Sequence, residues 1–223
     1  MKKLTSTIVI PTLLISSFIA GYQVANFKIN KQNEEDMLMA RLNSGLWLED
    51  YESTFITPEL EKAIAKEKAT LAIYETFSKK VPGKKMYEFV KEALKKQKAE
   101  YGSMGCIDKI DPLLIACIIY RESRFNPSTV SSAGALGLTQ VMPLHLKNLK
   151  AAGIVDNVNK KELLEWQKNI RAGIFVLLSY AKATDDITKA LMMYNAGPKR
   201  PHFGAKYARR ILRDYQEVEE QWK

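Results

Sequence analysis

The sequence predicts a mainly α-helical protein. Apolar residues recur at helical spacing in several stretches, residues typical of helix caps stand at the expected helix ends, and no pair of segments alternates apolar and polar residues as exposed β-strands do. The chain has 223 residues, of which 46% are hydrophobic and 26% charged, which is typical of a globular protein with a sizeable core. We therefore expect helices throughout, with at most a small β-hairpin.

Residues 1–28 predict a membrane anchor or a signal segment. After Met1-Lys2-Lys3, the 24 residues from Leu4 to Phe27 include no charged side chain. A helix of this length is long enough to cross about 30 Å of hydrocarbon. An uncleaved anchor and a cleaved signal peptide both fit this pattern, although no clear cleavage site occurs near Ala20 or Ala25. In either case we expect the remainder to be exported.

Residues 29–84 are expected to form a polar connector and an accessory helix, ahead of a helical domain at 85–223. The accessory helix begins with Thr57 as its cap and Pro58 in its first turn, and Val81-Pro82-Gly83 ends it. The last predicted helix has Tyr207, Ile211, Tyr215 and Val218 on one face, a pattern typical of core contacts. Besides a central helix, the domain is predicted to have helices near Lys85–Glu100, Lys160–Tyr180, Asp186–Tyr194 and Ala205–Glu220.

The central helix is predicted to be buried and to carry a carboxylate at its end. Asp111 is its cap, Pro112 takes the first helical position, and Leu113–Tyr120 is apolar all round. Asn126-Pro127 is expected to end it. Glu122 therefore lies at the C-terminal end of a hydrophobic helix.

Two effects are expected to raise the pKa of the Glu122 carboxyl. Burial disfavours its charged form, and so does the negative end of the helix dipole. A carboxyl that stays protonated near neutral pH is suited to general acid catalysis. The alternative is a solvated glutamate paired with Arg121 or Arg124, and this residue alone does not decide between the two.

Three motifs follow one another along the domain. The first starts at the candidate acid and continues into a loop rich in serine and glycine, and the other two fall on later predicted helices. In order, they are Glu122-Ser123-x-Phe125-Asn126-Pro127 with Ser131 and Gly134-Ala135-x-Gly137-Leu138-x-Gln140-x-Met142-Pro143, then Asn169-Ile170-x-x-Gly173, then Ala190-Leu191-x-Met193-Tyr194-Asn195-Ala196-Gly197-Pro198.

These motifs resemble the lytic transglycosylase family, of the soluble type with a lysozyme-like catalytic domain. The likeness extends from about Met86 to Tyr215. It implies cleavage of the β-1,4 bond between N-acetylmuramic acid and N-acetylglucosamine in peptidoglycan. Glu122 would protonate the leaving oxygen and then act as base on the 6-hydroxyl of the muramoyl sugar, giving a 1,6-anhydro product. The substrate-binding residues implied by the resemblance are Ser131, Gly137, Leu138, Gln140, Tyr194 and Asn195.

The motifs contain no second carboxylate, although ordinary glycosidases use two, about 5–9.5 Å apart. Asp185 and Asp186 are interpreted as the cap of a helix. This absence fits intramolecular attack, while a hydrolysing muramidase and a non-catalytic wall-binding assembly factor remain as alternatives. The chain also departs from the family pattern at Thr139, where methionine is usual, and at Met193, where alanine is usual. Residues 102–109 resemble an insertion.

No cofactor or metal is expected. The two cysteines, Cys106 and Cys117, and the two histidines, His145 and His202, lack the spacing of a zinc site. Export permits a Cys106–Cys117 disulfide, and the alternative is that both are free, Cys117 within a buried helix.

The expected partners follow from the charge and from the resemblance. The formal net charge is +9, which suits an anionic polymer or surface, and no nucleic-acid motif is present. We expect peptidoglycan strands, the membrane through the N-terminal segment, and an envelope-spanning assembly, but no nucleic acid. The expected location is the inner membrane facing the periplasm, an exported state, or the envelope or virion of a phage. One basic cluster is either solvated or meets acidic stem peptides: Lys199, Arg200, Lys206, Arg209 and Arg210.

Overall fold

The computed structural model describes residues 58–102 and 105–220, and the predicted membrane segment lies outside these ranges. Within them the fold is helical, as predicted, and the β-structure is limited to two isolated bridges, Val130 to Leu136 and Leu136 to Val141. The α-helices are α2 (Pro58–Phe77), α3 (Gly83–Tyr101), α4 (Pro112–Ser123), α5 (Leu146–Ala151), α6 (Trp166–Thr184), α7 (Ile187–Ala196) and α8 (Ala205–Glu219). Four short 3-10 helices connect them, η2 (Gly105–Ile107), η3 (Pro143–His145), η4 (Lys160–Leu164) and η5 (Pro201–Gly204).

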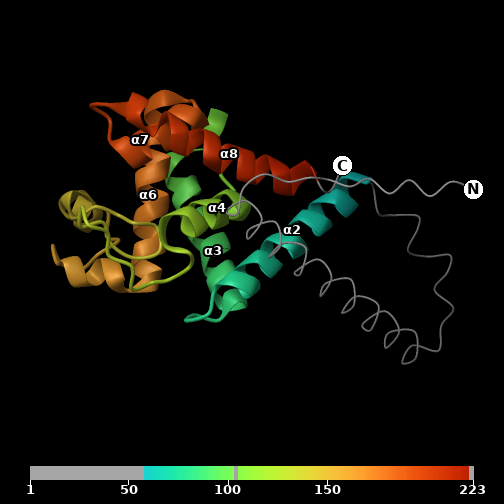
Figure 1. The fold of residues 1–223 in the computed structure, drawn as a ribbon, viewed down its shortest axis with the longest axis horizontal. Helices are drawn as coiled ribbons and strands as arrows, with labels where there is room; N and C mark the ends of the chain where they lie inside the picture. The colour runs from blue at the N-terminus through green and yellow to red at the C-terminus, as the bar shows by residue number, and fades with distance from the viewer. Residues whose placement is uncertain (1–57, 103–104, 221–223) are drawn as a thin grey trace, which may run out of the picture.

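Helix α4 is the buried centre of the domain, with α2, α3 and α8 packed around it (Figure 1). The Asp111 side chain accepts a hydrogen bond from the backbone N–H of Leu114 at 2.9 Å, and Pro112 opens the helix, as predicted. All side chains from Leu113 to Tyr120 are at most 2% exposed. Burial of this whole apolar run fixes the position of the residues that follow it.

Helix α2 contributes to the same core as the domain that follows it. Ala69, Ile73 and Tyr74 belong to the main hydrophobic cluster, and the Tyr74 hydroxyl donates to the backbone oxygen of Pro112 at 3.0 Å. Helix α2 thus packs in the same core as residues 85–220. The division of the chain at residue 84 stays a prediction.

Three local features differ from the predicted helices. Helix α4 ends at Ser123, ahead of the predicted stop at Asn126-Pro127, because Arg124 and Phe125 both adopt left-handed backbone conformations with φ of 53° and 59°. The helix predicted over 160–180 is divided at Glu165, which is extended, into η4 and α6. Helix α5 was not expected, because it has only six residues.

A second hydrophobic cluster supports the loop that follows α4. It joins the loop through Leu136 and Val141 to α5, to η4 and to one face of α6 through Ala172. In Figure 1 these segments lie beside α6, in the yellow-green to gold part of the chain. The loop is therefore packed on a core of its own.

The cysteines and the helix lengths bear on two further expectations. Cys106 and Cys117 are both buried and both free, so no disulfide joins them. Of the helices in residues 58–102 and 105–220, none combines the length and the apolar character needed to cross a membrane.

Candidate active site

Glu122 lies in the last turn of α4, where the buried helix reaches a partly exposed region. The backbone N–H of Arg124 donates to the Tyr120 oxygen at 3.1 Å, and the left-handed backbone conformation of Arg124 ends the helix there. Burial raises the pKa of the Glu122 carboxyl to about 7, while the neighbouring Tyr207 hydroxyl acts in the opposite direction. Near neutral pH, protonated and charged forms are thus both populated.

Neither neighbouring arginine pairs with Glu122. Arg121 donates to both carboxylate oxygens of Asp214 in α8, at 2.5 and 2.6 Å. The guanidinium of Arg124 lies over the ring of Tyr120, 4.3 Å from its centroid. The structure therefore does not show the alternative in which Glu122 is paired with Arg121 or Arg124.

Two tyrosines, from α7 and α8, lie close enough to Glu122 for its charge to affect them. Burial first, and then the charge of Glu122, raises the pKa of Tyr194 and of Tyr207. Tyr194 donates to the backbone oxygen of Thr139 at 2.7 Å. The buried Tyr207 hydroxyl faces Glu122 without the geometry of a full hydrogen bond, and has no other partner within the described residues.

Tyr207 was not among the predicted site residues. Its spacing with Ile211 and Val218 indicated a core position, and its ring does pack against the core beside those residues. Only the approach of α8 to the end of α4 brings its hydroxyl to Glu122, a relationship that spacing along one helix does not contain.

The loop after α4 is closed by its own hydrogen bonds. The Ser131 hydroxyl oxygen accepts from the backbone N–H of Ala135 at 2.9 Å, and the Gly137 N–H donates to the Thr129 oxygen at 2.8 Å. Among the described residues, no hydrogen bond joins Ser131 to Glu122. Ser131 therefore stabilises the turn, and its hydroxyl hydrogen is left for another acceptor.

Gln140 and Leu138 also hold the loop in shape. The Gln140 side-chain nitrogen donates to the backbone oxygens of Thr129 and Gly137, at 3.1 and 2.8 Å. The Leu138 side chain is fully buried in the main core. Gly137 and Leu138 are buried and Gln140 is partly exposed, so this segment presents the Gln140 amide oxygen to a ligand.

Asn169 in α6 links the second motif to the first. Its amide oxygen accepts from the backbone N–H and from the hydroxyl of Thr139, both at 2.8 Å, and its nitrogen donates to the oxygens of Leu136 and Leu163, at 2.8 and 2.7 Å. Every hydrogen-bonding position of this buried side chain is therefore used, as expected of a buried polar group.

The departure at Thr139 has a local explanation. Its hydroxyl bonds to Asn169, and its side chain fills the space over Gly173, where a Cβ would lie 2.5 Å from the Thr139 Oγ1 atom. Thr139 and Gly173 thus fit one another, and Tyr194 binds the Thr139 backbone from the other side. The three motifs meet around this residue.

Asn195 lies one residue beyond Tyr194, near the end of α7, and its side chain is exposed. Gly197 ends the helix, with φ of 76°. The structure therefore brings Glu122 and Tyr194 together, places the loop of Ser131 to Gln140 against α6 and α7, and leaves Asn195 open to solvent.

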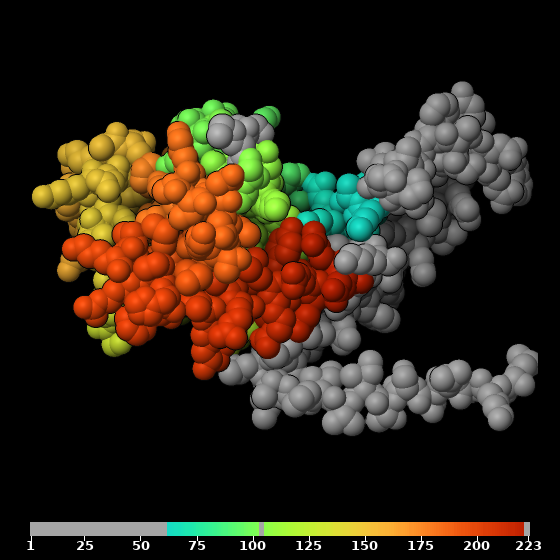
Figure 2. Space-filling model, turned by 90° about the horizontal axis from the view of Figure 1, so that it is seen from above, coloured from blue at the N-terminus to red at the C-terminus, as the bar shows by residue number. Residues whose placement is uncertain are grey.

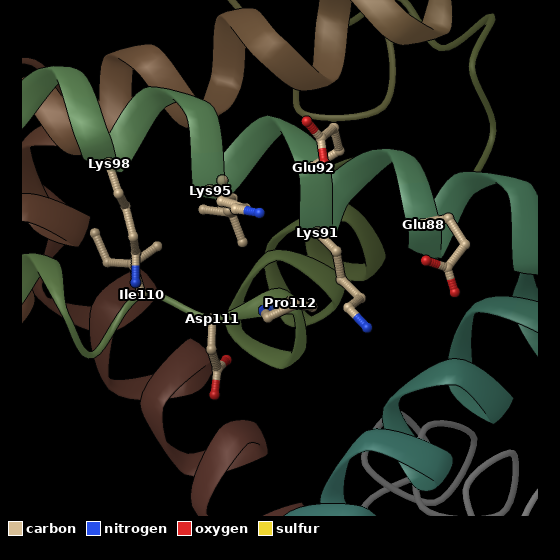
Figure 3. Close-up of a pocket in the computed structure, with 9 residues that line it drawn as sticks. Glu88, Lys91, Glu92, Lys95, Lys98, Ile110, Asp111 and Pro112 are labelled. Atoms are coloured by element: carbon tan, nitrogen blue, oxygen red, sulfur yellow. The ribbon is translucent and has the colours of Figure 1, made fainter.

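A groove of about 470 Å³ lies elsewhere, between α3 and the start of α4. Figure 3 shows lysines and glutamates of α3 beside Asp111 and Pro112. Asp111 and Glu122 lie at opposite ends of α4, about 16 Å apart at helical rise, so this groove is not part of the Glu122 site. Metal sites are also absent from the described ranges, where no three Cys, His, Asp or Glu side chains cluster suitably.

The comparison with protein families gives one match over just over half of the chain. The model of the transglycosylase SLT domain matches residues 102–214, which contain α4, the loop, α6, α7 and most of α8. This range holds all three motifs and excludes all of α2 and α3.

Curated relatives agree with this match. The chain is 33% identical to the transglycosylase of Enterobacteria phage PRD1, over 47% of this chain and 36% of the phage protein. It is 30% identical to the invasion protein IagB of Salmonella typhi, over 50% of this chain and 71% of that protein. It is 35% identical to the membrane-bound lytic murein transglycosylase C of Histophilus somni, over 40% of this chain and 27% of that one.

The alignments thus span about a third of the phage protein and most of IagB. The family expected from the motifs and its helical, lysozyme-like fold are confirmed by the family match and by the observed helices. This chain belongs to the transglycosylase SLT domain family.

Proposed function

We propose that this chain is a peptidoglycan lytic transglycosylase that cleaves the β-1,4 bond between N-acetylmuramic acid and N-acetylglucosamine. Membership of the SLT domain family supports the reaction class. The observation that carries the proposal is Glu122, a carboxyl at the end of a buried helix whose pKa is raised to about 7.

The proposed chemistry uses Glu122 twice. As an acid it donates its proton to the glycosidic oxygen, and the bond to the anomeric carbon breaks. As a base it then removes the proton of the muramoyl 6-hydroxyl, whose oxygen bonds to that carbon and closes the 1,6-anhydro ring. A group with a pKa near the working pH can perform both proton transfers.

The surroundings of Glu122 support an intramolecular nucleophile. Among the described residues, no other carboxylate acts on the pKa of Glu122, and the nearby Asp214 is bound to Arg121. The two-carboxylate arrangements of ordinary glycosidases therefore have no counterpart there. A hydrolysing muramidase with the same fold would give a different product, and the test below distinguishes them.

We assign substrate binding to the six residues expected from the motifs. Tyr194 lies beside Glu122, and Asn195 follows it with an exposed side chain. In the loop, we assign direct contacts to the amide oxygen of Gln140 and the hydroxyl of Ser131, while the buried Gly137 and Leu138 shape the surface between them. Their fixed positions in the loop support this assignment.

The proposed location is the cell envelope, with residues 1–28 at the membrane and the catalytic domain outside the cytoplasm. The uncharged stretch of Leu4–Phe27 supports this, and so does a relative that is named membrane-bound. An envelope-spanning assembly is the partner proposed for such an enzyme, which would open the wall locally.

The product spectrum of digested sacculi tests the proposal. Purified sacculi are incubated with the full chain, and the released muropeptides are measured by mass spectrometry. We expect 1,6-anhydro ends, and reducing muramic ends would instead identify a muramidase. Glu122→Gln should release no product, while Glu100→Gln, an exposed glutamate of α3, should act like the wild type. Full activity of Glu122→Gln would refute the role of Glu122, and an inactive wild type would favour a wall-binding factor.

A further inference from the structure

One segment of the domain has a strongly one-sided charge. Residues 187–213 contain seven lysines and arginines and no aspartate or glutamate. The next acidic residue along the chain is Asp214, so the second half of α8 contains charges of both signs. The excess therefore lies on α7, on the turn before η5 and on the first half of α8.

Five of these seven cations have no ion pair within the described part of the chain. Lys189 lies 3.7 Å from Asp186 and Arg213 lies 3.7 Å from Glu217, whereas the others are exposed and unpaired there. We call these five the basic face: Lys199, Arg200, Lys206, Arg209 and Arg210.

An exposed aromatic side chain lies among the cations of the basic face. Phe203 in η5 is 67% exposed, and it is the only phenylalanine, tyrosine or tryptophan of the described residues with a largely exposed side chain. Its neighbour Gly204 packs tightly on α7, since a Cβ there would lie 2.2 Å from the Met192 oxygen. Close packing of η5 therefore holds Phe203 at the surface.

Three cations of the basic face lie on the exposed side of α8, and the other two, Lys199 and Arg200, lie in the turn before η5. Ala208, Ile211 and Val218 are buried, while Lys206 and Arg209 are exposed on the other side of the helix. Figure 2 shows α7, η5 and α8, in orange and red, as one continuous face of the molecule.

We infer that the basic face and Phe203 dock on the surface of an anionic phospholipid bilayer. Five cations spread over a helix and a separate loop match a surface with many negative charges better than one small anion. Lysine and arginine near such a surface attract it, and an exposed phenylalanine can enter the interface between headgroups and acyl chains. The apolar stretch predicted at Leu4–Phe27 would keep a bilayer within reach. This inference does not depend on the proposed reaction.

The test uses a fluorescent probe on the full chain. Phe203→Cys is labelled with an environment-sensitive thiol reagent, since Cys106 and Cys117 are buried. Vesicles contain phosphatidylcholine with either roughly 30% or no phosphatidylglycerol, the anionic lipid, plus a brominated quencher lipid. We expect a blue shift and quenching in anionic vesicles only. A probe at Val158→Cys, 54% exposed and ahead of η4, should show neither.

Charge variants test the role of the cations. Lys206→Gln, Arg209→Gln and Arg210→Gln together should lower the ratio of lipid-bound to free probe on the order of 100-fold. The matched triple Lys84→Gln, Lys85→Gln and Lys96→Gln removes equal charge from α3 and should have little effect. Circular dichroism checks that both triple variants fold. In the probe variant without charge substitutions, a higher salt concentration should also release the protein surface from the vesicles.

Three results would overturn the inference. The probe at Phe203→Cys could stay exposed on anionic vesicles, it could respond equally to neutral vesicles, or the α8 triple could leave it unchanged. If the probe stays exposed while the α8 triple loses binding to intact sacculi, then the face binds the carboxylates of the cell wall instead.

Discussion

Arg121 binds Asp214 of α8 with two hydrogen bonds, although Glu122 is its immediate neighbour in the chain. This pair joins the end of α4 to α8, the helix that also carries Tyr207. Because Arg121 is bound to Asp214, it does not pair with Glu122. Burial therefore raises the pKa of Glu122 with no arginine to oppose it. One ion pair thus serves both the packing and the electrostatics of the site.

Loss of the Asp214 carboxylate should destabilise the domain. Asp214 is almost fully buried, and its removal leaves the Arg121 charge without its partner. We expect Asp214→Ala to lower the free energy of unfolding by about 3–5 kcal/mol, measured by urea denaturation. Glu217→Ala, which breaks a longer and more exposed pair with Arg213, should cost less than about 1 kcal/mol. Similar losses for both variants would contradict this view of the interface.

Glu122→Gln should stabilise the protein at alkaline pH. The pKa of the folded carboxyl is about 7, above its ordinary value of 4.5. The unfolded chain therefore releases this proton first, and the free energy of unfolding of the wild type falls as the pH rises from about 4.5 to about 7. The glutamine variant has no such loss. Its advantage should grow by about 3 kcal/mol between pH 4 and pH 8.

Urea unfolding at a series of pH values measures this difference. Glu100→Gln serves as the control, because it removes a carboxylate from an exposed position of α3 outside the site. A constant difference between wild type and Glu122→Gln would mean that the carboxyl is not buried as described.

Tyr207→Phe should shift the alkaline limit of activity upward. The Tyr207 hydroxyl lowers the pKa of Glu122, so its removal raises that pKa further and keeps the acid form to higher pH. The pH profile of sacculus digestion measures this shift. Stability should change little, since the hydroxyl lacks a full hydrogen bond. Tyr101→Phe, in α3, is the control, and an equal shift in that variant would argue against a local effect.

Two glycines of the loop should respond differently to alanine. Both have positive φ, 85° at Gly134 and 75° at Gly137. A Cβ at Gly134 meets nothing within 4 Å, so Gly134→Ala should cost only the backbone strain, about 1 kcal/mol. A Cβ at Gly137 would lie 2.3 Å from the Asn169 side-chain nitrogen and 2.6 Å from the Leu163 oxygen.

Gly137→Ala should therefore cost at least about 3 kcal/mol and reduce activity, because Asn169 must move and release Thr139. Thermal and urea unfolding of the two variants give the comparison. If Gly134→Ala proved as harmful as Gly137→Ala, the close approach of α6 to the loop would not be the cause.

The sequence predicts those parts of the fold that depend on one segment at a time. Asp111 and Pro112 define the start of α4, and the apolar run behind them places Glu122 at its buried end. The end of α4 was less predictable, because Arg124 and Phe125 adopt left-handed conformations that neither residue favours by itself. The break at Glu165 is another case, since packing of η4 against α6 overrides the helical spacing.

Relationships between segments were the least predictable. Tyr207 carries the same spacing signal as the core residues beside it, and only the tertiary structure turns its hydroxyl toward Glu122. The two cysteines illustrate the same limit, since spacing alone left their disulfide open, and both are free.

The bonds of Asn169 have a thermodynamic consequence for ligand binding. They hold the loop backbone at Leu136 and Thr139 from inside the protein, with no contribution from a ligand. The conformational entropy of the loop is therefore lost when the chain folds, and a polymer that enters later meets a surface already in place. Affinity for a weakly charged, flexible glycan can then come from few contacts, since only the glycan itself must become ordered.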